Sequence, residues 1–197
     1  MQVRLVLYGV IVPSLLFIIG CNQNHTIKSS DDQPTLAKPK IRTSFVLTDI
    51  DGRSTTLDLL DGHLRLSRVV QPIVLLHFFS TRANLCRAML PYLSDLQRKR
   101  SQKVFVLGIM VPESIETDLL RDFMRQNDTS FFVSESRDNN ALGDAIASML
   151  KLGSNYPLPL TLVFDHGTYI THYEGVTPIE MIRNDLNALE STPRRSL

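Results

Sequence analysis

Two long and nearly uninterrupted apolar runs constrain the fold of this chain more than any other feature. They are residues 72–79 (PIVLLHFF) and 103–111 (KVFVLGIMV), both rich in branched and aromatic side chains. A strand that is apolar at almost every position needs cover on both faces, as in the centre of a parallel sheet. Between them, residues 88–100 carry leucines at helical spacing, with basic residues at the end. The sequence therefore predicts a strand, a helix and a second, neighbouring strand.

The remaining segments continue the alternation of strand and helix patterns. An alternating strand at 44–53 reaches the turn residues Asp51 and Gly52, and a turn at 165–167 separates the last two strands. His63 is assigned to a loop beside Gly62. Further strands are expected at 54–60, 131–133, 160–164 and 169–173, and helices at 112–126, 140–152 and 178–189. This order predicts an α/β fold, a three-layer sandwich with a central mixed sheet flanked by helices.

The charge balance argues against partners that are chosen by charge alone. The formal net charge is +1, and Arg4 is the only charged residue among the first twenty. The rest of the chain is therefore neutral overall, which gives no electrostatic reason to expect binding to nucleic acid. The histidines show no metal-ligand spacing, so no metal and no cofactor is expected.

The N-terminus has the form of a secretory signal. Arg4 precedes an apolar run, residues 5–19, that is short for a membrane span of about 20 residues but typical of a signal peptide. The run ends in Ile18-Ile19-Gly20-Cys21, which resembles the bacterial lipobox. The resemblance implies cleavage after Gly20 and a lipid on Cys21, hence a cell-envelope protein anchored to membrane lipid. The alternative is an uncleaved anchor helix that carries a chance cysteine.

A polar segment separates this signal from the predicted domain. Residues 22–40 (NQNHTIKSSDDQPTLAKPK) contain two prolines and few apolar side chains, too few to support a core. We therefore expect a signal peptide at 1–20, a flexible tether at 21–40, one folded domain at 41–190 and a polar tail at 191–197.

Three segments, in order, resemble the TlpA/ResA-type branch of the thioredoxin superfamily. Residues 45–52 (FVLTDIDG) resemble its entry hairpin, F-x-L-x-D-x-x-G. Residues 78–91 (FFSTRANLCRAMLP) resemble F-W-A-T-W-C-P-P-C-R-x-E-M-P, and residues 159–167 (PLTLVFDHG) resemble P-T-T-F-L-I-D-x-x-G. The resemblance implies a thioredoxin-like sandwich over residues 45–189 and descent from thiol–disulfide oxidoreductases.

The chain differs from that family in the residues that carry out the redox reaction. Ala83 stands where the family has the first cysteine of C-x-x-C, and only the second, Cys86, remains. Dithiol exchange needs one sulfur to attack and the other to resolve the mixed disulfide. By position, Cys86 is expected one helical turn deeper, buried and slow to react. His77 aligns with the buried acidic residue of thioredoxins, so Cys86 and His77 are the candidate catalytic pair, with a packed thiol and a core histidine as the alternatives.

The resemblance also implies a surface for a substrate. Arg82 and Ala83 would form its lip, and Pro159, preceded by Leu158, aligns with the cis-proline that faces the cysteines in the family. The predicted partner is an extracytoplasmic protein client, met by a monomer that acts as a monothiol or as a protein-binding module.

Three other functions meet obstacles in the sequence. A peroxiredoxin-like or other monothiol antioxidant enzyme using Cys86 is the main alternative, but Ala83 replaces the threonine that peroxiredoxins need. A Cys–His hydrolase lacks any local signature here. A copper-delivery protein of related fold would need two cysteines at the site.

Overall fold

The structure is a computed structural model that describes residues 43–111 and 115–191. The predicted signal peptide, Cys21 and the tether lie outside the described residues. Among the described residues, no helix has the length and apolar character needed to cross a membrane.

The centre of the fold is a mixed sheet of eight strands in the order β1-β2-β3-β8-β7-β4-β5-β6. Strands β4, β5 and β6 run parallel, whereas the other neighbours run antiparallel. The strands are β1 (Ser44–Thr48), β2 (Ser54–Leu60), β3 (His63–Leu66), β4 (Ile73–Phe79), β5 (Val104–Met110), β6 (Phe132–Ser134), β7 (Leu160–Asp165) and β8 (Thr168–Glu174). The two apolar runs are β4 and β5, which pair in parallel as the sequence predicts.

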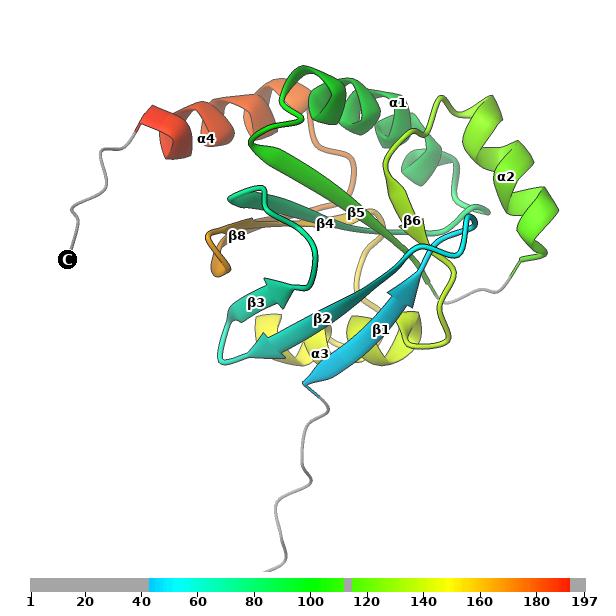
Figure 1. The fold of residues 1–197 in the computed structure, drawn as a ribbon, viewed down its shortest axis with the longest axis horizontal. Coiled ribbons are helices and arrows are strands. Elements are labelled where there is room, and N and C mark those ends of the chain that lie inside the picture. Colours follow the sequence, from blue (N-terminus) through cyan, green and yellow to red (C-terminus); the bar gives the residue numbers. More distant parts are fainter. Residues whose placement is uncertain (1–42, 112–114, 192–197) are drawn as a thin grey trace, which may run out of the picture. The chain divides into compact units, whose positions relative to one another are not determined.

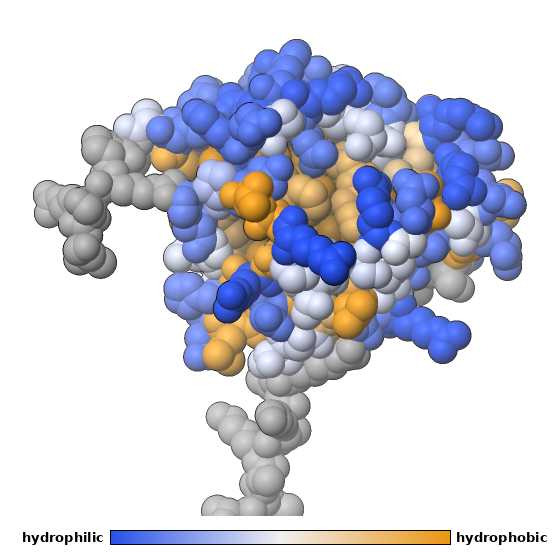
Figure 2. All heavy atoms as spheres, viewed as in Figure 1, coloured by the Kyte–Doolittle hydropathy of each residue, from blue (hydrophilic) through white to orange (hydrophobic). Residues whose placement is uncertain are grey.

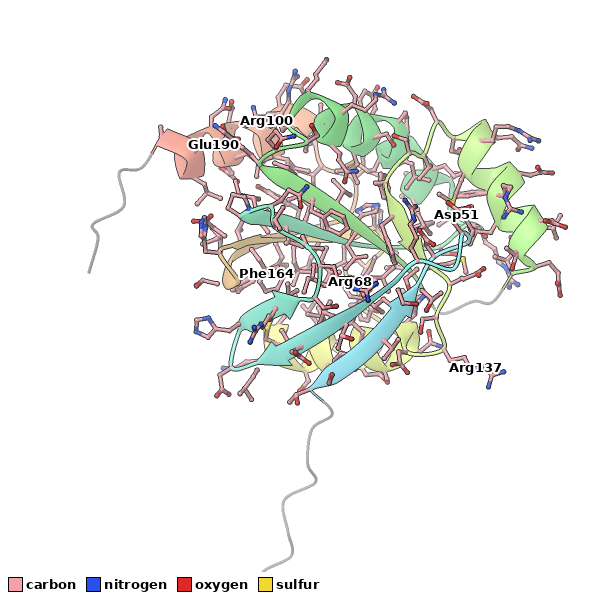
Figure 3. All side chains as sticks on the ribbon, viewed as in Figure 1. Asp51, Arg68, Arg100, Arg137, Phe164 and Glu190 are labelled. Atoms are coloured by element: carbon pink, nitrogen blue, oxygen red, sulfur yellow. The ribbon has the colours of Figure 1, made fainter. Side chains whose placement is uncertain are left out.

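Within the described residues, four helices cover the two faces of this sheet. They are α1 (Asn84–Lys99), α2 (Thr117–Gln126), α3 (Asn139–Leu150) and α4 (Ile179–Ser191). Figure 1 shows α1, α2 and α4 on one side of the central strands, and α3 with strands β1 to β3 on the other. Arg100, just after α1, holds α4 through Glu190, with 2.8 Å between Nη1 and Oε1 (Figure 3). The predicted three-layer α/β sandwich with a mixed central sheet is confirmed.

Strand β4 has no exposed residue because two apolar cores lie on its opposite faces. Leu75 and Phe79 point into the core beneath α1, α2 and α4, which also contains Cys86. Leu76 and Phe78 point into the core formed with α3 and the first hairpin. Side chains alternate along a strand, so a strand between two cores must be apolar throughout.

Several element boundaries differ from the predictions, for local reasons. His63 was placed in a loop but begins β3, a strand of four residues whose only fully buried side chain is Leu64. So short a strand leaves almost no periodic signal and forms through its pairing with β2. Helix α3 ends before Lys151, which adopts the left-handed conformation (φ 58°), where Gly153 was expected to end it. Helix α1 begins at Asn84, earlier than predicted, after an Ala83 that offers no side-chain cap.

Candidate functional site

The residues singled out from the sequence meet where β4 ends and β7 begins. Phe78 pairs with Leu160, so the loop after β4 and the peptide before β7 start from the same edge of the sheet. That loop carries Arg82 and leads into α1. The bond between Leu158 and Pro159 is cis, as at the proline of the family pattern. In α/β sheets, ligand sites gather at this carboxyl end of the central strands.

Cys86 lies in the first turn of α1 with 0% of its surface exposed. The backbone N–H of Ser80 points at its sulfur, with 3.5 Å between N and Sγ. Met89 and Leu90 belong to the same apolar core. Within the described residues Cys86 takes part in no disulfide. Its burial is as the sequence predicts, and it keeps the thiol away from any reagent that stays in solvent.

Ala83 occupies the position that would carry the attacking thiol. It is the residue before α1, with an extended backbone (φ −92°, ψ 116°), and its carbonyl accepts the N–H groups of Cys86 and Arg87 at 3.1 and 3.3 Å. Its methyl group is half-buried against the core that contains Cys86. Arg82 beside it is exposed. A methyl group supplies no nucleophile, so the lip of the site can contact a partner but cannot attack a disulfide.

His77 points to the same face of the sheet as Cys86 and is completely buried. Its Nδ1 lies 2.8 Å from the Oγ1 of Thr161 on β7, and its ring stacks 5.9 Å from that of Phe79. Its Nε2 is buried and has no hydrogen-bond partner among the described residues. Burial lowers the pKa of His77 from 6.5 to about 3. The imidazole is therefore neutral at physiological pH and a weak base there.

Thr161 and Tyr173 extend His77 into a polar row that the sequence did not single out. Strand pairing places Thr161 opposite His77, and Tyr173 of β8 opposite Thr161. The Tyr173 hydroxyl donates to Asp185 on α4. Burial and then this carboxylate raise the pKa of Tyr173, so its hydroxyl keeps its proton. The sequence offered one signal for this row, a threonine within an otherwise apolar strand.

Exposed apolar side chains lie on the segments that carry the site. Leu85 is 62% exposed, and Val176, in the loop after β8, is 46% exposed. The N–H of Gly175 donates to the carbonyl of Pro159 (2.8 Å), which ties this loop to the cis-proline. Leu158 is half-buried, whereas Pro159 is buried. Of the four residues predicted to contact a substrate, Arg82, Ala83 and Leu158 are at least partly accessible, and Pro159 is the least accessible.

The other described histidines lie elsewhere. His166 sits in the β7–β8 turn with its Nδ1 2.7 Å from Asp165 Oδ1. His172 on β8 lies 2.7 Å from the Tyr169 hydroxyl and 3.3 Å from Glu174. Within residues 43–111 and 115–191, no group of three or more histidine, cysteine, aspartate or glutamate side chains is placed to hold a metal ion.

Comparison with known proteins supports the fold through structure alone. No family model and no curated protein sequence matches this chain. Among solved structures, Mycobacterium tuberculosis DsbF matches with a TM-score of 0.53 at 13% identity, over 75% of this chain and 96% of that one. StoA from Bacillus subtilis gives 0.52 at 15%, over 74% and 98%. The exposed lipoprotein thioredoxin Etrx1 from Streptococcus pneumoniae gives 0.52 at 18%, over 74% and 98%. The chain therefore has the thioredoxin-like fold that its motifs implied.

Proposed function

We propose that this protein is a thioredoxin-like lipoprotein of the bacterial cell envelope that binds a protein client without dithiol exchange. The observation that carries the proposal is the complete burial of Cys86 behind Ala83. Exchange needs an accessible thiolate at the lip and a second sulfur to resolve the intermediate. The lip instead presents a methyl group, an arginine and apolar side chains.

The surface around the lip supports binding of a polypeptide. Leu85, Val176 and the half-buried Leu158 offer apolar area next to the exposed Arg82. Apolar side chains flanked by arginine are typical of protein contact surfaces, which combine an apolar centre with a polar rim. These residues come from three separate segments, and the bond from the Gly175 N–H to the Pro159 carbonyl joins two of them before a client arrives.

The envelope location rests on the N-terminal sequence. The apolar run that ends at Gly20-Cys21 supports lipidation of Cys21, and one similar structure is itself named an exposed lipoprotein. Labelling of growing cells with a fatty acid should mark the wild type and Cys86→Ser equally, and should not mark Cys21→Ser. Equal labelling of all three proteins would refute the lipid anchor.

The client surface is tested by crosslinking in cells. A photoreactive amino acid at Leu85 should give discrete crosslinked products that survive reducing agent and persist when Cys86 is changed to Ser. The matched control is the same photoreactive residue at Leu60, which is 61% exposed at the end of β2. That position should give no such products.

The other outcomes separate the candidate functions. Crosslinked products that disappear with Cys86→Ser, or a client released by reducing agent, would establish Cys86 as a working monothiol. The antioxidant alternative would then regain support, and the polar pair of His77 and Thr161 on the same face would be its proton-handling group. A second photoreactive position, Val176, tests the same surface. If neither position 85 nor position 176 gives crosslinked products, the client-binding surface is refuted.

A further inference from the structure

A pocket lies at the opposite end of the sheet from Cys86. It has a volume of about 640 Å³ and opens between the first hairpin and the edge formed by β5 and β6. Phe105 and Phe132 line it, with ring centroids 6.4 Å apart and planes tilted by 51°. Phe105 is the second residue of β5, whereas the candidate site lies beyond the last residue of the parallel strand β4. Figure 2 shows a hollow in this face with an apolar floor and hydrophilic side chains around it.

The polar side chains that line this pocket are arginine, glutamine, serine and threonine, all of which can donate hydrogen bonds. Its charged lining residues are Arg53 and Arg68, and no described acidic side chain lines it. Gln97 uses its Oε1 to accept the N–H of Val106 at 2.7 Å, which leaves its amide hydrogens as the end that can donate. Such a lining disfavours a cation and favours an anion, because every charge on it is positive.

The two arginines differ in whether a carboxylate already neutralises their charge. Arg53 is compensated, because its Nε and Nη2 lie 2.7 and 2.6 Å from Oδ2 of the buried Asp49. Arg68 is exposed and has no hydrogen bond or ion pair within the described part of the chain. Figure 3 shows Arg68 over the middle of this face. Arg68 is therefore the guanidinium whose charge is available to a ligand.

Arg68 is held in place by its backbone. It adopts the left-handed conformation (φ 64°), which is uncommon for a residue with a side chain. Ser67, just before it, is fixed to β2: its N–H donates to Thr56 O at 2.9 Å, and its carbonyl accepts the Thr55 hydroxyl at 2.6 Å. The N–H of Thr56 in turn donates to Ser67 Oγ at 2.8 Å. The position from which the Arg68 side chain starts is thus set before any ligand binds.

We propose that this pocket binds a small organic anion that carries an apolar group, with Arg68 and Gln97 holding the acid group and Phe105 and Phe132 contacting the apolar body. The volume lies within the range typical of ligand sites, about 300–1,000 Å³. Arginine holds a carboxylate through two parallel N–H groups, and aromatic walls contribute apolar contact area. The pocket lies apart from Cys86, so this site does not depend on the proposed client surface.

Ligand-observed ¹⁹F NMR with 4-(trifluoromethyl)benzoate tests the site on the full chain in zwitterionic nanodiscs, with empty nanodiscs as the blank. The wild type should broaden the benzoate signal more than that of 4-(trifluoromethyl)benzamide, which has the same shape without the charge. Arg68→Gln should weaken binding of the acid about tenfold, the loss expected for one charge-assisted pair. Arg68→Lys should lose less, because the charge is kept.

The matched control is Arg65→Gln, on the exposed side of β3 and outside the pocket. It should bind the acid as the wild type does, and all variants should unfold at the same temperature. Acetate, which has the acid group without an apolar body, should not displace the benzoate at equal concentration. Equal binding of acid and amide, or unchanged binding in a folded Arg68→Gln, would overturn the proposal.

Discussion

The imidazole of His77 on β4 contacts the hydroxyl of Thr161 on β7 on a buried face of the sheet, with 2.8 Å between Nδ1 and Oγ1. The two residues are 84 positions apart in the chain and are paired in the strand register. They place a hydrogen-bonded polar pair on the face that also buries Cys86, beside a core that is mainly apolar. This arrangement makes the charge state of one histidine a determinant of stability.

The depressed pKa of His77 predicts acid sensitivity. Because its pKa is about 3 in the fold and 6.5 when unfolded, the unfolded chain binds an extra proton between these values. The contribution of neutral His77 to the free energy of unfolding is therefore fully present above about pH 6.5. It falls by about 1.4 kcal/mol per pH unit below that value. Denaturant unfolding from pH 4 to 8 should show a flatter dependence for His77→Leu. His166→Gln, a change at an exposed turn histidine, should keep the wild-type slope, and an unchanged slope in His77→Leu would contradict the assignment.

Burial predicts that Cys86 reacts slowly with iodoacetamide. Alkylation, followed by mass spectrometry of the peptide that contains Cys86, should be far slower in the native protein than in urea, because access requires opening of α1. A cysteine placed at the neighbouring exposed position, Leu85→Cys in a Cys86→Ser background, should react at the rate of a solvent-exposed thiol. Fast native labelling of Cys86 would show that the thiol reaches solvent.

A cysteine at position 83 should restore the missing dithiol. The Cys86 N–H donates to the carbonyl of Ala83, the residue that precedes α1, at 3.1 Å, and the Ala83 methyl packs on the core that contains Cys86. Ala83→Cys should therefore form an intramolecular disulfide under mild oxidation, seen as a loss of two mass units. Ala88→Cys, two residues beyond Cys86 on a different side of the helix, should not. If neither variant forms the bond, the equivalence of Ala83 with the first cysteine of the family is wrong.

The space around two glycines predicts different effects of substitution by alanine. A Cβ at Gly143, inside α3, would lie 2.5 Å from the Tyr156 hydroxyl, so Gly143→Ala requires the Tyr156 side chain, which makes an edge contact with Phe78, to shift. We expect a loss of about 1–3 kcal/mol, despite the better helix propensity of alanine. At Gly153 nothing lies within 4 Å, so Gly153→Ala should be neutral or slightly stabilising. Urea unfolding of both variants checks the contrast, and a Gly143→Ala protein as stable as the wild type would refute the close packing of Tyr156.

The sequence by itself determined the parts of this protein that depend on local pattern. The apolar runs predicted β4 and β5 because short runs rich in branched and aromatic residues are typical of strands buried on both faces. The resemblance of residues 78–91 to the family pattern predicted that Cys86 would be buried one turn beyond Ala83. The N-terminal signal stays a prediction, because Cys21 lies outside the described residues.

The tertiary structure decided what depends on residues that are distant in the chain. The pairing of His77 with Thr161 follows from the register of two strands, which no local pattern records. Strand β3 forms through its antiparallel pairing with β2. The pocket around Arg68 needs Phe105 and Phe132 from the far edge of the sheet. Local propensity acts over a few residues, whereas these sites form when hydrogen bonding and burial bring separate segments together.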